Sequence, residues 1–186
     1  MSPEQRRDAI VAATIPLVRE HGFDVSTRQI AEAAGVAEGT LFRVFDDKDS
    51  LLRCAVRAAL DPSEAESQLT SIDMTAPLAA RVEQAAVVLQ QRMFDVLQLA
   101  AAVGLANVPQ PESGREHIQF ERMNELLTAI FEPDRDTLSR DPADAARLLR
   151  IIAFGGSHAR LTEGPVMTPA EVTDLLLHGI VRDTTD

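Results

Sequence analysis

The amino-acid sequence predicts an all-α protein made of two helical domains. Apolar residues recur at helical spacing through most of the 186 residues, and capping and stop signals divide the chain into segments of helical length. Runs of alternating β-branched and aromatic residues, which would predict strands, are nearly absent. We therefore expect an N-terminal module of four short helices, residues 1–60, and a C-terminal helical domain, residues 61–186.

Each helix of the first module has its own start signal. Ser2 and Ser26 each begin a capping box with a glutamine three residues later, and Asp47 is placed to cap the helix that follows it. Gly22 and Gly35 are stop signals, because glycine readily adopts the left-handed conformation that ends a helix. The expected helices are residues 3–21, 27–34, 38–45 and a fourth from 48 to shortly before Pro62.

The C-terminal domain is expected to begin with a polar stretch, residues 61–75. Pro77 then opens a long helix, and Asp141 and Thr168 open the last two. The helix after Asp141 is apolar nearly all the way round, so it must be covered on several sides. The expected helices are residues 77–106, about 118–131, 142–161 and 169–180, with a loop at residues 107–113.

Composition excludes several protein classes. Hydrophobic residues make up 45% of the chain and charged residues 25%, which is typical of a soluble globular protein and not of a disordered one. No signal segment is expected at the N-terminus, and the longest apolar run, residues 99–106, is far shorter than the roughly 20 residues that cross a bilayer. The single cysteine, Cys54, forms no internal disulfide, so we expect a cytoplasmic protein with Cys54 as a small buried residue.

The net charge of −11 is concentrated in the C-terminal two-thirds of the chain. Residues 1–60 carry eight basic and nine acidic side chains, whereas residues 61–186 carry ten and twenty. A nearly neutral first module can still present a basic face to nucleic acid, while the acidic remainder limits non-specific attraction to DNA. Charge alone does not predict DNA binding here.

Two short helices joined at a glycine turn form the geometry that places one helix in a major groove of DNA. Gly35 permits the turn, Val36 is placed to fill the gap between the two helices, and Ala31 is small enough to let them approach. Helical spacing with a glycine turn is common, so these features by themselves support DNA binding only weakly.

The full string of residues is much more specific. Residues 27–45, TRQIAEAAGVAEGTLFRVF, followed by Lys48 and Leu51-Leu52, closely resemble the DNA-binding signature of the TetR family of transcriptional regulators. The preceding residues 19–23, REHGF, resemble the end of that family's first helix. The resemblance covers residues 8–56 and implies a helix-turn-helix module followed by a helical ligand-binding and dimerisation domain.

The resemblance implies a set of DNA contacts. Thr27 is expected to contact a phosphate, and Arg28 a base edge or a phosphate, because both lie in the first turn of a helix, where backbone N–H groups attract anions. Lys48 is expected to pair with a phosphate as a point charge. In the second helix of the pair we expect DNA contacts from Glu38, Gly39, Thr40, Phe42 and Arg43.

Arg43 is the best candidate for a guanine contact, because its planar fork matches the two acceptors of that base. Thr40 offers a hydroxyl to phosphate or a methyl to thymine, and Gly39 allows close approach to the groove. Glu38 has two open interpretations: its carboxylate stabilises the N-terminus of its own helix, or it accepts a hydrogen bond from a cytosine amine. Leu41 and Phe45 are expected to be core residues.

The sequence departs from the family pattern at three positions. Phe42 stands where the family usually has a tyrosine, so one phosphate contact is expected to be missing. Val44 stands where a histidine is common, which removes another polar contact. Ala37 replaces the usual serine cap, which should cost the following helix about 1 kcal/mol.

The resemblance also implies a homodimer built from the last two helices. The sequence supports a close-approach patch on the helix after Asp141 and an apolar stripe on the final helix, which would form a four-helix contact in the dimer. The alternative is that these residues fill the core of one chain. The expected interface residues are Phe154, Gly155, Gly156, Leu175, Leu176 and Ile180.

The resemblance also implies a small-molecule effector bound inside the C-terminal domain, and the methionine and phenylalanine residues of that domain lead us to expect an apolar one. Methionine and phenylalanine make adaptable apolar walls, although at helical spacing such residues are more often core. The candidate pocket residues are Met93, Phe94, Leu97, Phe120, Met123 and Phe131.

Other classes of function find little support. The four histidines are scattered without metal-ligand spacing, and no catalytic constellation is present, so neither an enzyme nor a metal or cofactor is expected. A helical adaptor that has lost DNA binding is the stronger alternative, given Phe42, Val44 and the acidity. The favoured hypothesis is a ligand-responsive repressor, associated with the bacterial nucleoid when bound, that holds a palindromic operator as a homodimer.

Overall fold

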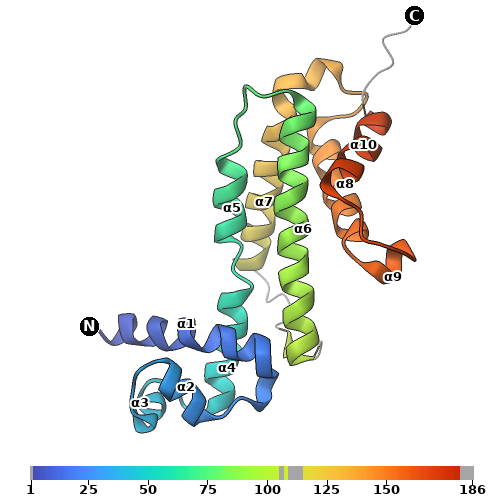
Figure 1. The fold of residues 1–186 in the computed structure, drawn as a ribbon. Coiled ribbons are helices and arrows are strands. Elements are labelled where there is room, and N and C mark those ends of the chain that lie inside the picture. Colours follow the sequence, from blue (N-terminus) through green and yellow to red (C-terminus); the bar gives the residue numbers. More distant parts are fainter. Residues whose placement is uncertain (1, 105–106, 109–114, 181–186) are drawn as a thin grey trace, which may run out of the picture. The chain divides into compact units, whose positions relative to one another are not determined.

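The computed structural model describes residues 2–104, 107–108 and 115–180 (Figure 1). All the regular elements of these residues are helices, so the predicted all-α class is confirmed. The chain divides into two compact units: Met1–Asp61 with Asp95–Glu112, and Pro62–Phe94 with Ser113–Asp186. The elements are α1 (Pro3–His21), η1 (Gly22–Asp24), α2 (Thr27–Ala33), α3 (Glu38–Val44), α4 (Lys48–Ala59), α5 (Ser63–Thr70), α6 (Leu78–Val103), α7 (Arg115–Phe131), η3 (Glu132–Thr137), α8 (Pro142–Gly156), α9 (Ala159–Thr162) and α10 (Pro169–Ile180).

The helices of the first unit begin where the sequence predicts. Ser2 and Ser26 both form complete capping boxes with Gln5 and Gln29, and the Asp47 carboxylate accepts a hydrogen bond from the Ser50 N–H at 2.6 Å. α1 packs against α4 and α2, and α2 packs against α3. These caps fix the starts of three helices and leave the turns between them short.

The core of the first unit is filled from all four of its N-terminal helices and from the end of α6. Ile10 and Val18 of α1 are each 1% exposed, and they contact a cluster that includes Leu52 of α4 and Leu99 of α6. Each fully buried side chain of this kind stabilises the fold by about 1.5–3 kcal/mol. The first unit therefore needs residues from two distant segments of the chain.

α6 supplies residues to both units. Its first part belongs to the second unit, and its last residues, from Asp95 onward, belong to the first. By length and composition it is the one helix of the described residues that is apolar enough to cross a membrane, a test that core helices of soluble proteins also pass. Its buried residues, which include Val82 and Leu99, pack in the two hydrophobic cores.

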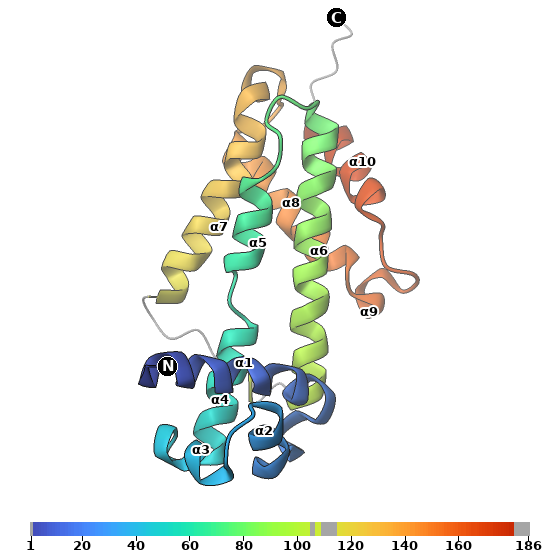
Figure 2. The same cartoon turned by 60° about the vertical axis from the view of Figure 1, so that its left-hand side comes forward.

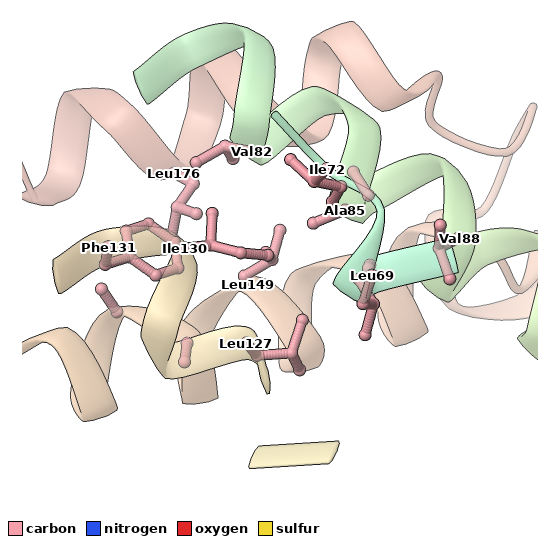
Figure 3. Packing of buried hydrophobic residues seen from close by; sticks show 14 of the residues in the cluster. Leu69, Ile72, Val82, Ala85, Val88, Leu127, Ile130, Phe131, Leu149 and Leu176 are labelled. Atoms are coloured by element: carbon pink, nitrogen blue, oxygen red, sulfur yellow. The ribbon is translucent and has the colours of Figure 1, made fainter. Parts of the chain in front are cut away.

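The second unit is a bundle in which α8 packs against α7 and α10, and α5 packs against α7 (Figure 2). Side chains from α5, α6, α7, α8 and α10 converge on one core (Figure 3). Leu127, Phe131 and Leu149 are fully buried there. α8 was predicted to be covered on several sides; α7 and α10 pack against it, but Ile151 and Phe154 on α8 stay 52% and 48% exposed.

A buried arginine ties together the loop before α6, the end of α7 and η3. The Arg81 side chain is 4% exposed and pairs with Asp134. It also donates to the carbonyl oxygens of Ile130, Met74 and Ala76, at 3.2, 3.2 and 2.8 Å. Because a buried charge is costly unless it is paired and hydrogen-bonded, these partners are what make the position tolerable.

The structure differs from the predicted helices in three main respects. The stretch expected to be polar contains α5, which buries Ala65 and Leu69 one helical turn apart. The long helix ends at Val103 because Gly104 adopts a φ of +81°. The helix after Asp141 ends at Gly156, well before the predicted residue 161, and α9 follows as a separate short turn.

Candidate nucleic-acid interface

α2 and α3 are joined by a glycine-cornered turn. Gly35 has a φ of +63°, and its N–H donates to the Glu32 carbonyl at 3.1 Å, while the Val36 N–H donates to Ala31 at 3.0 Å. This pair of hydrogen bonds is the Schellman motif, which requires a left-handed residue at the glycine position. The predicted role of Gly35 is therefore confirmed.

A small set of apolar residues attaches the helix pair to the first unit. Ile30 and Ala31 are the buried residues of α2, and Leu41 is the buried residue of α3. Phe45, directly after α3, is 4% exposed. Leu41 and Phe45 thus lie in the core as predicted, and Val36 packs partly buried against the same cluster. α3 is held by few apolar contacts, so most of its surface is free.

The free surface of α3 carries the residues predicted to contact DNA. Glu38, Gly39, Phe42 and Arg43 are exposed, and Phe42 is 52% exposed although it is a large apolar residue. Thr40 is half-buried, and Arg28 is exposed at the start of α2. A Cβ added at Gly39 would meet no atom within 4 Å, so the fold itself does not require glycine at this position.

Two of the predicted contact residues bind each other. The Thr27 hydroxyl donates to a carboxylate oxygen of Glu38, which joins the first residue of α2 to the first residue of α3. A carboxylate beside the predicted phosphate contact adds negative charge at that point. Ala37, the N-cap of α3, makes no side-chain cap hydrogen bond, in line with the prediction from the sequence.

Lys48 has a partner inside the protein. Its Nζ donates to the Phe23 carbonyl oxygen at 2.8 Å, and the side chain is partly buried. The ammonium group therefore links the start of α4 to η1, a contact that sequence reasoning did not predict. An ammonium has three donors, so a hydrogen bond to phosphate stays compatible with this one.

Two further contacts of this unit were not predicted from the sequence. Gly22 ends α1 as predicted, with a φ of +59°, but a Cβ there would also lie 2.2 Å from the Ala102 carbonyl oxygen of α6. Arg7 of α1 reaches the end of α3 and Cys54 of α4. Arg7 is exposed, but it lies in register with the buried residues Ile10, Thr14 and Val18 of α1, and that spacing was the available signal that its side chain lies beside the other helices of the unit.

The six candidate pocket residues do not form one cavity wall among the described residues. Phe131 is fully buried and Met123 is 8% exposed, both within the hydrophobic core, whereas Phe94 and Phe120 are 53% and 50% exposed. Met93 and Leu97 are half-buried, and the Phe120 ring lies 4.2 Å from the Arg150 guanidinium carbon. For Phe131 and Met123 the core interpretation is the one that the packing favours.

The second unit does have an open groove of about 610 Å³ elsewhere. It is lined by Glu121, Asn124, Glu125, Thr128, Ala129 and Glu132, which lie on α7 and at the start of η3. Three of these six residues are glutamates, and none of them is a candidate pocket residue. Sequence reasoning missed it because these residues form the solvent face of a helix.

The candidate dimer residues are also divided by the structure. Phe154 and Leu175 are 48% and 55% exposed, as an interface with a second chain requires. Leu176 is 1% exposed and packs in the chain's own core, and Gly156 is buried against Met167, so the expected surface stripe is narrower than predicted. Gly155 is half-buried, and the side chain of Ile180 lies outside the described residues.

No group of three or more acidic, histidine or cysteine side chains among the described residues is arranged to hold a metal ion. Cys54 is half-buried, and its sulfur accepts a hydrogen bond from the Arg7 guanidinium.

Residues 10–55 match the family described as bacterial regulatory proteins, tetR family. The chain is 38% identical over 64 residues to the HTH-type transcriptional regulator HbdR of Aromatoleum sp. (strain CIB), an alignment that covers 34% of this chain and 28% of that protein. The chain therefore matches less than a third of the length of this curated relative.

Two solved structures show that the likeness of fold extends over the whole chain. A putative tetR-family transcriptional regulator from Mesorhizobium loti MAFF303099 has a TM-score of 0.64 at 19% identity and covers 98% of this chain and 100% of its own. SmeT, in a complex with triclosan, has a TM-score of 0.54 at 20% identity, covering 97% of this chain and 93% of its own. Residues 10–55 thus match the tetR family of bacterial regulatory proteins, and the chain as a whole is similar in fold to the two solved structures.

Proposed function

We propose that the protein is a DNA-binding transcriptional regulator that inserts α3 into a major groove. The observation that carries the proposal is the exposed face of α3, where Gly39, Phe42 and Arg43 lie free on a helix fixed by a glycine turn. A helix presented in this way can bring side chains to base edges. The proposed role is regulatory and not enzymatic, in keeping with the family of regulatory proteins that residues 10–55 match.

Within this proposal the contact residues have distinct roles. Arg43 donates to a guanine, while Thr40 and Phe42 contact phosphate, sugar or a thymine methyl. Thr27, Arg28 and Lys48 hold the backbone of the duplex. Because Glu38 already accepts from Thr27, a phosphate that approaches Thr27 must compete with this carboxylate. The affinity for DNA is expected to depend mainly on Arg28, Arg43 and Lys48.

We further propose that the protein acts as a homodimer on a palindromic operator. Exposed apolar residues on α8 and α10, Phe154 and Leu175, support an interface there. Two copies related by a twofold axis would present two α3 helices to half-sites about one helical turn, roughly 34 Å, apart.

A small apolar effector is proposed to regulate DNA binding, with repression as the mode of action. SmeT was solved with triclosan, which supports small-molecule binding by this fold. α6 supplies side chains to the cores of both units, so a ligand that shifts this helix would alter the packing of the DNA-binding unit. Such a ligand acts only through the difference between its affinities for the state that binds DNA and the state that does not. We place the protein in the cytoplasm.

The proposal is tested by selecting bound duplexes from a random pool with the full-length protein. The expected result is an enriched palindrome whose half-sites are spaced by about one helical turn. If no sequence is enriched, and the affinity for DNA varies with salt concentration but not with sequence, the helical adaptor would be the favoured alternative. Operator affinity that stays constant across a panel of apolar small molecules would count against the sensing part alone.

A further inference from the structure

Arg7 on α1 makes three contacts at the far end of α3. Its Nη1 donates to the Val44 carbonyl oxygen at 3.3 Å, and its Nη2 donates to the Cys54 sulfur at 3.1 Å. The guanidinium carbon also lies 4.5 Å from the centre of the Phe45 ring. One side chain of α1 thereby joins the last residue of α3, the residue after it, and the middle of α4.

The end of α3 is a favourable place for a cation. Val44 is the final residue of the helix, and the last carbonyl groups of a helix have no partner within it and carry partial negative charge. The face of the Phe45 ring attracts a cation as well. Arg7 satisfies both groups at once, and its planar fork is suited to bridging several acceptors.

α3 depends on such contacts more than a longer helix would. It has seven residues, buries only Leu41, and begins at an N-cap that makes no side-chain hydrogen bond. Helices this short have little stability of their own. The polar contacts at its two ends, Thr27 with Glu38 and Arg7 with Val44, therefore act with Leu41 to set its orientation.

We propose that Arg7 is a positioning residue of the recognition helix, which holds the C-terminal end of α3 through Val44 and Phe45 and supports sequence-specific DNA binding without contacting the duplex. The proposal rests on the proposed function for its effect on DNA. Direct phosphate contact is the competing role for an arginine in this unit. The donors of Arg7 are directed at Val44 and Cys54, and this arrangement favours positioning.

The test compares Arg7→Met with Arg6→Met in the full-length protein. Arg6 is the neighbouring exposed arginine, and among the described residues its side chain has no hydrogen bond, ion pair or ring contact. Both variants lose one positive charge from the same turn of α1, so long-range electrostatics are matched. Each is measured on the duplex selected by the unsubstituted protein and on a scrambled duplex of equal length.

Arg7→Met should lose about tenfold in affinity for the selected duplex relative to Arg6→Met, an effect of the size expected for one or two such contacts. Its affinity for the scrambled duplex and its salt dependence should match those of Arg6→Met. A salt slope shallower by about one than that of Arg6→Met would identify a phosphate contact and overturn the proposal. So would equal affinities of the two variants on both duplexes.

Hydrogen exchange in the free protein provides a measurement that does not depend on DNA. Arg7→Met should exchange the amides of residues 42–45 faster than Arg6→Met, with α2 unchanged. Equal rates would overturn the proposal even if the protein binds no preferred sequence, whereas faster exchange together with no sequence preference would refute the proposed function alone. If Arg7→Met does not fold, Arg7→Lys takes its place, because the point charge of lysine cannot bridge three groups. The amides of residues 42–45 should then exchange faster in Arg7→Lys than in the unsubstituted protein. Equal rates in these two proteins would overturn the proposal.

Discussion

The hydroxyl of Thr27 is hydrogen-bonded to the carboxylate of Glu38, so the two helices of the DNA-binding pair are joined at their N-terminal ends. The same two residues are predicted to lie at the surface that meets DNA. A carboxylate at this point stabilises the free protein and opposes a phosphate in the complex. The hydrogen bond between Thr27 and Glu38 is therefore favourable in the free protein, whereas the charge of Glu38 is unfavourable in the complex with DNA.

Glu38→Gln should raise the affinity for any duplex by a few fold at low salt, because it removes a negative charge near phosphate while keeping an acceptor for Thr27. Binding to a scrambled duplex, measured by fluorescence anisotropy, checks this. Glu32→Gln, at an exposed position later on α2, is the matched control. A loss of preference at a single base pair would instead show that Glu38 reads a base.

Arg43→Ala and Lys48→Ala should weaken DNA binding in different ways. Arg43→Ala should cost about 1–3 kcal/mol on the selected operator and relax the preference at one base position. Lys48→Ala should weaken all duplexes alike and make the salt slope shallower by about one. Titrations at several salt concentrations separate the two effects, and the same pattern from both variants would contradict the assigned roles.

Lys48→Ala should also lower the free energy of unfolding by about 1 kcal/mol, because it removes the hydrogen bond to the Phe23 carbonyl oxygen. Urea denaturation checks this part of the prediction.

Ala37→Ser should stabilise the protein by about 1 kcal/mol, because α3 has no side-chain cap and a serine hydroxyl would accept from a backbone N–H of its first turn. Thermal or urea denaturation provides the measurement. Ala12→Ser, in the exposed middle of α1, is the control and should be slightly destabilising. The prediction is wrong if both serines have the same effect.

Gly22→Ala should destabilise the protein by more than about 2 kcal/mol, because the position has a positive φ and the new methyl would lie against the Ala102 carbonyl. Gly39→Ala is the contrasting variant: it meets no atom and should stabilise α3 by up to about 1 kcal/mol. If Gly39 admits the backbone of α3 to the groove, this more stable variant should bind the operator less tightly. Denaturation and operator titration together test both positions.

The capping box of α10 predicts one component of the pH dependence of stability. Hydrogen bonds from the Thr168 backbone N–H and then from its hydroxyl lower the pKa of Glu171 below its ordinary value of 4.5. The ionised carboxylate therefore stabilises the folded state above that value, and the contribution is lost as the pH falls through the lowered pKa. Denaturation of Glu171→Gln and the unsubstituted protein across acidic pH should give curves that converge as the pH falls. Parallel curves would contradict the assignment.

Much of the fold could be predicted because it is encoded locally. The capping boxes at Ser2, Ser26 and Thr168 each lie within four residues of sequence, and the turn at Gly35 depends on one backbone conformation. Such signals need no knowledge of distant contacts. The all-helical class and the helix-turn-helix followed from them.

The features that were missed depend on tertiary contacts. α5 has only two buried apolar residues, Ala65 and Leu69, so its pattern is weak until its neighbours are known. α8 ends at Gly156, whose carbonyl accepts from the Met167 N–H at 2.8 Å, a partner that lies eleven residues later. The contacts of Lys48 and Arg7 likewise depend on groups 25 and 37 residues away.

The candidate pocket and interface residues show the limit of composition as a guide. Phe131 and Leu176 have the residue types of a ligand wall and a dimer stripe, yet both are core residues of the second unit. A helical stripe identifies which residues share a face but not what covers that face.

The contribution of α6 to the first unit has a consequence for dissecting the molecule. A fragment cut after Asp61 would lose Leu99 and Val103, which complete the core around Ile10 and Leu52. It would also lose the backbone at Ala102 against which Gly22 is fitted. A minimal version of this unit would have to be built by grafting residues 95–103 back onto it, since the unit is contiguous in space and interrupted along the chain.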